Sequence, residues 1–163
     1  MKNKIAVVTS TYPNFGPEEA LAGISAAGFK YVDMATCPGY FEHILPKPED
    51  MAPGDYQQVV DKVASYNLKM ISVSGHTRLG TDDGVERLKK VIDFASQAGV
   101  SYLVTDAGED EDKFYTQISP LADYAQDKDI TICLEMHGPW LNNGTKGAET
   151  VKKVDRSQRK AKL

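Results

Sequence analysis

Short apolar runs alternate with longer amphipathic runs along most of this chain. Five runs of four to six residues are rich in apolar and β-branched side chains, which is typical of strands in a parallel sheet. Between them, apolar residues recur at spacings of three and four, which predicts helices with one buried face. The predicted strands are Ile5–Ser10, Tyr31–Ala35, Met70–Ser74, Tyr102–Thr105 and Ile130–Glu135.

Helix boundaries are predicted from residues that favour helix ends. Pro17 suits the first helical position, and Gly28 suits the position after the last turn. Asp55, Thr81 and Thr145 are predicted N-caps of three further helices, because their side chains can accept from free amides of the first turn. The sequence therefore predicts a helix after each of these strands, and the pattern is least regular after the fourth.

Pro120 complicates the helix expected between the last two strands. An acidic turn, Glu109–Asp112, follows the fourth strand, and a helical pattern then begins near Lys113. Proline inside a helix removes a hydrogen bond and clashes with the preceding turn. We therefore expect a first turn from Lys113 and a separate main helix that Ser119 caps, with Pro120 at its first position.

Strand–helix alternation of this kind predicts an α/β protein, a parallel (βα)5 chain with right-handed crossovers. Two architectures fit: an open flavodoxin-like five-stranded sheet, or five units of an eight-unit TIM barrel. A barrel takes about 250 residues, so five units take about 156, and this chain has 163. Two strands carry a small polar face opposite an apolar one, whereas central strands of an open sheet are apolar on both faces. We therefore predict a partial TIM barrel, with the open sheet as the alternative. The polar faces are Ser72, Ser74 and His76, and Thr131, Cys133 and Glu135.

Composition and charge exclude several classes of function. A net charge of −4 and a pI near 5.4 give no footprint for nucleic acid or an acidic membrane. Cys37 and Cys133 make neither a disulfide framework nor a zinc pattern. The apolar run near the amino terminus is too short for a signal peptide, so we expect a cytoplasmic protein. We divide the chain into one domain, residues 1–154, and a basic, frayed tail, residues 155–163.

No nucleotide cofactor is expected. The run Thr9–Thr11 with Gly16 faintly resembles a flavodoxin phosphate loop, but it lacks the compact glycine spacing and has Pro13 inside it. A phospho-acceptor domain is also disfavoured, because the first strand ends without a pair of acidic residues.

Three motifs resemble the xylose isomerase-like barrel superfamily. They are G-F-K-Y-V-D at Gly28–Asp33, S-G-H-T at Ser74–Thr77 and L-E-M-H-G-P at Leu134–Pro139, within a resemblance that spans residues 4–154. This superfamily includes sugar phosphate isomerases and epimerases and the endonuclease IV type of nuclease. The resemblance implies that Glu135 binds a divalent cation (Mn, Mg, Co or Zn) and transfers a proton next to a substrate carbonyl. It also implies that His76 binds the metal or the substrate.

The family's remaining metal ligands come from strands six to eight, and no strand is predicted after Val154. We therefore expect a truncated or frame-shifted sugar or sugar phosphate isomerase or epimerase with impaired or absent activity. One alternative is a non-catalytic (βα)5 remnant that forms homo-oligomers through open sheet edges. Another is a fragment of an endonuclease IV-type hydrolase.

Further substrate-binding candidates lie in loops on the mouth side. Tyr40, Phe41 and His43 belong to the long connection 36–54, which is of a length typical of lids, and ordinary loop packing is their simpler interpretation. His137 and Trp140 follow Glu135 in the next loop. Asp33 and Asp106 also end strands, and we expect them to support or cap the site rather than bind metal. For Glu135 and His76 the simpler interpretations are an ordinary ion pair and a backbone-bonded turn residue.

Overall fold

A single mixed sheet forms the centre of the molecule in its computed structural model, which describes residues 3–160, with backbone alone for 155–160. Its parallel strands follow one another in chain order: β1 (Ala6–Val8), β2 (Tyr31–Cys37), β4 (Lys69–Gly75), β5 (Tyr102–Thr105) and β6 (Thr131–Leu134). A short strand, β3 (Phe41–Glu42), pairs antiparallel with β2 beyond this order. All five predicted strands are therefore present, although β1 and β6 are shorter than expected.

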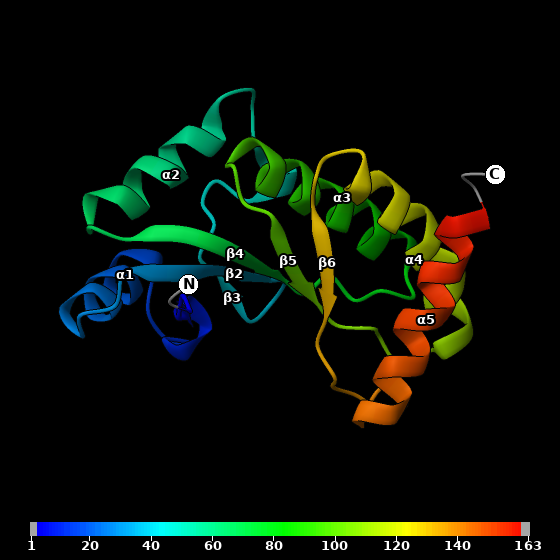
Figure 1. The fold of residues 1–163 in the computed structure, drawn as a ribbon. Helices are drawn as coiled ribbons and strands as arrows, with labels where there is room; N and C mark the ends of the chain where they lie inside the picture. The colour runs from blue at the N-terminus through cyan, green and yellow to red at the C-terminus, as the bar shows by residue number, and fades with distance from the viewer. Residues whose placement is uncertain (1–2, 161–163) are drawn as a thin grey trace.

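Helices follow each parallel strand. In Figure 1, α2, α3 and α4 lie in a row along one side of the sheet, and α5 lies beside α4. Two short 3-10 turns, η1 (Thr9–Thr11) and η2 (Pro48–Asp50), lie in the connections after β1 and β3. The helices are α1 (Pro17–Ala26), α2 (Asp55–Ser65), α3 (Asp82–Gln97), α4 (Glu111–Gln126) and α5 (Gly144–Lys160).

The strand order decides between the two predicted architectures. Neighbouring parallel strands are consecutive along the chain, without the reversal that gives a doubly wound sheet its switch point. An unreversed parallel order with a helix after each strand is the arrangement of a TIM barrel. The prediction of a partial TIM barrel is confirmed, and the flavodoxin-like alternative is wrong.

The two faces of the sheet differ as the alternation predicted. Val32, Val73 and Leu103 point to the helices and are completely buried in the core. The strand register then sets Asp33 beside Ser72 on the opposite face, because side chains alternate along a strand. The apolar face holds the fold together, and the polar face is left for chemistry.

Three helix predictions need correction. The helix α4 runs unbroken through Pro120, and Asp110 caps it by accepting from the Lys113 amide at 3.0 Å. Buried residues on both sides of Pro120, Phe114 and Leu121, anchor both halves to the core, and this packing outweighs the missing hydrogen bond.

The two other corrections concern N-caps. Asp55 is the first helical residue of α2, and its carboxylate accepts from the Ala52 amide instead of capping the helix. At α5, Asn143 rather than Thr145 accepts from a first-turn amide, that of Lys146. The predicted cap Thr81 is confirmed: its hydroxyl accepts from the Gly84 amide at 3.0 Å.

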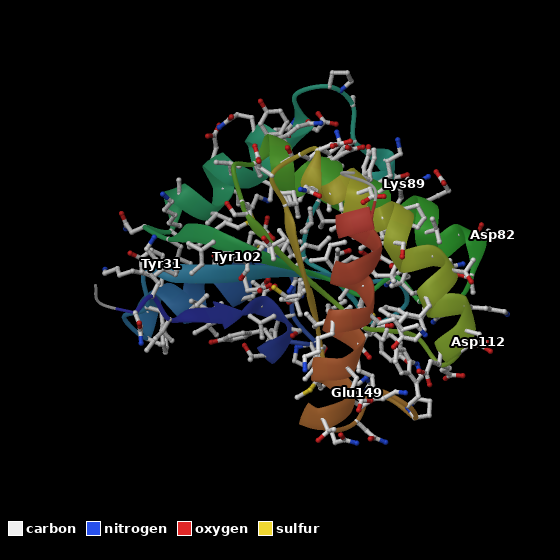
Figure 2. All side chains as sticks on the ribbon, turned by 45° about the vertical axis from the view of Figure 1, so that its right-hand side comes forward. Tyr31, Asp82, Lys89, Tyr102, Asp112 and Glu149 are labelled. Carbon is white, nitrogen blue, oxygen red and sulfur yellow. The ribbon has the colours of Figure 1, made fainter. Side chains whose placement is uncertain are left out.

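Acidic side chains lie at the outer surface of the helices. Figure 2 shows Asp82, Asp112 and Glu149 on α3, α4 and α5, pointing away from the sheet. Asp82 and Asp112 belong to first turns, where negative charge complements the helix dipole. Among the described residues, no helix combines the length and the apolar character that crossing a bilayer requires.

Candidate active site at the carboxyl ends of the strands

The carboxyl ends of three neighbouring strands bring one imidazole and two carboxylates together. His76, Asp106 and Glu135 directly follow β4, β5 and β6. Nδ1 of His76 lies 3.4 Å from Oδ2 of Asp106, and Nε2 of the same ring lies 3.5 Å from Oε2 of Glu135. The imidazole is therefore held between two acids, and Glu135 is the more exposed of them.

The contact between His76 and Glu135 is closer than the positions of their strands suggest. Two strand spacings, about 10 Å, separate β4 from β6, so the backbone alone would let the two residues reach one ion only from opposite sides. Their side chains instead converge over the end of β5 and meet directly. Glu135 thus pairs with a histidine rather than with a Lys or Arg. His76 faces carboxylates in addition to the hydrogen bond that its backbone amide donates to the Thr36 carbonyl at 3.1 Å.

Asp106 is fixed by the loop that follows it. Its Oδ1 accepts from the Gly108 amide at 2.8 Å, which leaves Oδ2 to face His76. Gly108 has φ +66°, and a Cβ there would lie 2.1 Å from the Leu79 carbonyl oxygen, so this close crossing of two loops requires glycine. Asp106 thus caps its own loop and orients the histidine, as predicted for a supporting residue.

The two acids favour the protonated form of His76. The hydrogen bond with Asp106 raises the pKa of His76, burial opposes this, and the negative charges of Glu135, Asp106 and Asp33 add to the rise. Burial alone would raise the pKa of Asp106, but the His76 hydrogen bond and the Gly108 amide outweigh it and hold this pKa below its ordinary value. The result is an imidazole between carboxylates that binds a proton more readily than an ordinary histidine.

Asp33 lies deeper on the same face. It is 8% exposed, and its Oδ2 accepts from the Ser72 hydroxyl at 2.5 Å. No described residue makes a hydrogen bond to Oδ1. Burial raises the pKa of Asp33, and hydrogen bonds from Ser72 and Ser74 limit the rise. Asp33 therefore lies below the exposed ends of the strands, where it is buried and does not face solvent as Glu135 does.

The described residues do not complete a metal site. No group of three or more His, Cys, Asp or Glu side chains within the described part of the chain has the geometry to hold a metal ion. Metal centres commonly draw at least three ligands from the protein. Glu135 and His76 are the predicted pair, and both nitrogens of the imidazole already face carboxylates.

The loop candidates lie in different surroundings. Tyr40 is 74% exposed, Phe41 is half-buried in β3, and its ring lies 6.1 Å from that of His43. His43 is buried, and its Nε2 lies 3.0 Å from the Phe15 carbonyl oxygen. These contacts explain how the segment packs, and the substrate roles of all three residues stay predictions.

Arg87 pins this segment to α3, a role that the sequence did not reveal. Its guanidinium donates to Thr36 and Glu42, each at 3.0 Å, and also pairs with Glu49. Thr36 in turn donates to Glu42 at 2.5 Å. One arginine on a helix surface resembles any solvated charge, so its contacts with an acidic loop had no sequence signal.

The loop after β6 separates the last two candidates. His137 is exposed, next to Gly138 in a left-handed turn. Trp140 donates from its indole nitrogen to the Gly108 carbonyl at 3.1 Å and packs against Phe114. Trp140 thereby braces the loop that holds Asp106, and the substrate roles of His137 and Trp140 also stay predictions.

A family model confirms what the topology indicates. The model described as Xylose isomerase-like TIM barrel matches residues 21–161 of this chain. The chain belongs to the xylose isomerase-like TIM barrel family. No curated protein sequence matches it significantly.

Solved structures agree with this fold. A xylose isomerase-like TIM barrel protein from Mycobacterium smegmatis, crystallised with magnesium, is 17% identical with a TM-score of 0.74, covering 93% of this chain and 61% of its own. D-allulose 3-epimerase from Methylomonas sp. is 26% identical with a TM-score of 0.63. The match covers 85% of this chain and 53% of the epimerase. A protein from Bacillus anthracis that is described as a probable 3-DHS dehydratase is 13% identical with a TM-score of 0.69. The match covers 94% of this chain and 60% of that protein.

The chain thus spans between 53% and 61% of the lengths of these three structures. The likeness to the Mycobacterium smegmatis and Bacillus anthracis proteins is a likeness of fold. These three solved structures include an epimerase and a protein described as a probable dehydratase, and the Mycobacterium smegmatis protein was crystallised with magnesium.

Proposed function

We propose that this chain carries the proton-transfer residues of a sugar isomerase or epimerase, and that its activity in isolation is weak. The observation that supports this most is the contact between Glu135 and His76 at the carboxyl ends of parallel strands, where such barrels carry their chemistry. The 26% identity to D-allulose 3-epimerase favours a small ketose as the substrate class.

Glu135 is the proposed general base. Its carboxylate is about half exposed and needs no rearrangement to reach a bound sugar. It would take the proton from the carbon next to the substrate carbonyl and return it to the neighbouring carbon, which isomerises the sugar. Epimerisation would need a second acid to return a proton to the opposite face of the same carbon.

His76 is the proposed partner of that step. Its imidazole faces Glu135, and Asp106 orients the ring from behind through Nδ1. In the protonated form that the two acids favour, its positive charge beside the carbonyl oxygen would stabilise the negative charge that develops there when the proton leaves.

No step of this proposal depends on a metal, because the described residues do not complete a metal site. A divalent cation (Mn, Mg, Co or Zn) for this chain stays a prediction, as do the cytoplasmic location, the truncation and the endonuclease-type alternative. Without a complete ligand set we expect turnover far below the range of about 1–10³ per second that is typical of enzymes.

Deuterium exchange tests the proposal. The protein is incubated with D-fructose in deuterated buffer, with and without Mn²⁺, and loss of the proton on carbon 3 is followed by NMR. We expect slow exchange above the uncatalysed rate. Glu135→Gln should lower it by at least about 100-fold, or to background, because general bases contribute about 10²–10⁴ in rate.

Glu149→Gln is the matched control, since Glu149 is an exposed acid on α5. Its exchange rate should equal that of the wild type. Exchange that is absent from the wild type, or unchanged by Glu135→Gln, would remove the enzymatic proposal and leave the non-catalytic module as the better description.

A further inference from the structure

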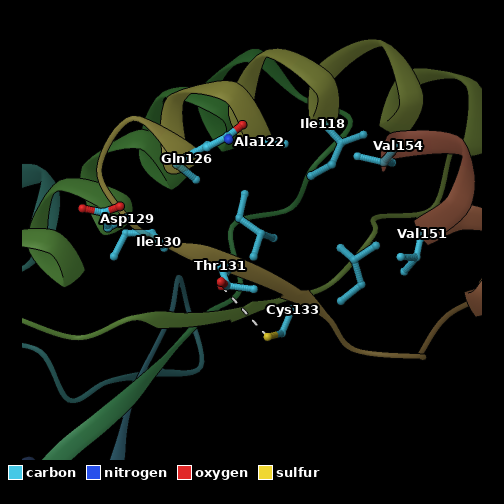
Figure 3. Close-up of a pocket in the computed structure, with 12 residues that line it drawn as sticks. Ile118, Ala122, Gln126, Asp129, Ile130, Thr131, Cys133, Val151 and Val154 are labelled. Atoms are coloured by element: carbon cyan, nitrogen blue, oxygen red, sulfur yellow. Dashed lines mark hydrogen bonds between the residues drawn. The ribbon is translucent and has the colours of Figure 1, made fainter. Parts of the chain in front are cut away.

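A groove of about 570 Å³ runs along β6 on the helix-covered side of the sheet. Figure 3 shows it between β6, the overlying helix α4 and the flank of α5. Aliphatic side chains make up most of its walls, among them Ile118, Ile132, Leu134 and Val151. Val151 points towards this groove and is 59% exposed, although it belongs to a helix that covers the sheet.

The groove lies next to an unpaired strand edge. Within the described part of the chain, β6 pairs with β5 alone, and β1 at the opposite end of the sheet pairs with β2 alone. Each edge exposes a row of backbone donors and acceptors that can pair with another strand. A groove beneath α5 and an open edge at β6 thus have room for one more parallel strand.

We propose that β1 of a second copy of this chain occupies this place and pairs in parallel with β6. The side chains of β1 fit the requirement. Ile5 precedes β1 and is 68% exposed, and it lies on the same side of the strand as Val7, which packs against the helix-covered core. The groove needs apolar side chains on that side of an incoming strand.

One register between β1 of the second copy and β6 places apolar side chains together on the helix-covered face. If Ala6 of the second copy lies beside Thr131, then Ile5 lies beside Ile130 and Val7 beside Ile132, under α5. A slip by one residue would turn both aliphatic side chains to the polar face.

Charge supports the same register. Lys4 lies two residues before Ala6, and Asp129 lies two residues before Thr131, so the register sets them side by side. Both residues are exposed, and Asp129 lines the groove. A slip by two residues would keep the apolar face but separate this ion pair.

Each contact joins two different strands, since β6 of one copy meets β1 of the other. Two such contacts related by a two-fold axis would close the sheets of two copies into one ring. We therefore expect a dimer in which the carboxyl ends of all parallel strands open on one side.

Sedimentation velocity at tens of micromolar tests the assembly. The wild type should be a dimer. Ile5→Ser and Val151→Ser should each weaken the dimer by about 10²- to 10⁴-fold, because each substitution removes two buried aliphatic side chains from a two-fold dimer and each side chain contributes about ten- to a hundredfold. Both residues are exposed within one copy, so circular dichroism should stay unchanged. Phe15→Ser, at another exposed apolar residue (59%), is the control and should leave the dimer intact.

Cross-linking tests the register. The variant Val8→Cys in a Cys37→Ser background sets its new thiol beside Cys133 of the second copy, at a strand spacing that a disulfide can bridge. Mild oxidation should give an intermolecular bond between these two positions, and adding Cys133→Ser should abolish it.

Three outcomes would overturn the proposal. They are a wild-type monomer, a dimer that survives both Ile5→Ser and Val151→Ser, and an intermolecular bond between two Cys133 side chains, which would indicate antiparallel pairing of two β6 edges.

Discussion

On the helix-covered face of the sheet, Val32, Val73 and Leu103 are completely buried, whereas the opposite face carries Asp33 and Ser74. These residues are direct neighbours along the same strands, so backbone and position differ little between them. What differs is the partner: helices on one side, and the hollow of the incomplete barrel on the other. Alternation along a strand thus separates the residues that stabilise this protein from those available for chemistry.

One polar residue of the covered face lies at the end of β2. Thr36 is completely buried on that side, and Arg87 and Glu42 satisfy its hydroxyl. A buried polar group is tolerated where its hydrogen bonds are made. Thr36 ties the long connection to α3.

The largest expected effect comes from adjacent substitutions on the two faces. Leu103→Ala should lower the free energy of unfolding by about 2–5 kcal/mol, because it leaves a cavity in the core. Val104→Ala, one residue on and partly exposed on the other face, should cost less than about 1.5 kcal/mol. Urea denaturation measures both, and equal losses would contradict the division into two faces.

A smaller effect is expected where the covered face is polar. Arg87→Met should lower the free energy of unfolding by about 1–3 kcal/mol, since it leaves mostly buried Glu42 with only the longer Lys47 contact, at 3.6 Å, as an ion pair. Lys89→Met, which removes an exposed pair with Glu86, should change stability by less than about 0.5 kcal/mol. If the two variants were equally stable, the Arg87 contacts would add nothing to the fold.

The smallest effect concerns the open face. Asp106→Asn should lower the pKa of His76 towards its ordinary value, because the hydrogen bond with Asp106 is the largest cause of the rise. NMR titration of the imidazole measures this directly. A pKa unchanged from the wild type would mean that Glu135, rather than Asp106, holds the charge.

The same pair sets the pH dependence of stability. A raised His76 pKa stabilises the fold below the ordinary pKa of histidine, and this contribution is lost as pH rises through the raised value. A lowered Asp106 pKa stabilises the fold above the ordinary pKa of aspartate, and this contribution is lost as pH falls through the lowered value. Both contributions are present together between those two ordinary pKa values. The stability difference between wild type and Asp106→Asn should therefore be greatest in mildly acidic solution.

Much of the site was predictable because strand ends are predictable. Glu135 and His76 follow apolar strands, and parallel strands present their carboxyl ends on one side, so their meeting at one mouth followed from pattern alone. Asp106 was predicted to support or cap the site rather than to bind metal. Arg87 was missed, because its partners lie in a loop far away in sequence. The hydrogen bond from Trp140 to Gly108 was also missed, because it depends on how two loops cross.

By itself, the sequence determined the five strands and the polar and apolar faces, because these depend on local spacing that every strand and helix must satisfy. The family was predicted from the resemblance of three motifs. The tertiary structure alone decided the unreversed strand order, the unbroken α4 and the direct contact of His76 with Glu135. Those features depend on packing between distant segments: buried residues on both sides of Pro120 hold one helix together, and two long side chains span the end of a third strand.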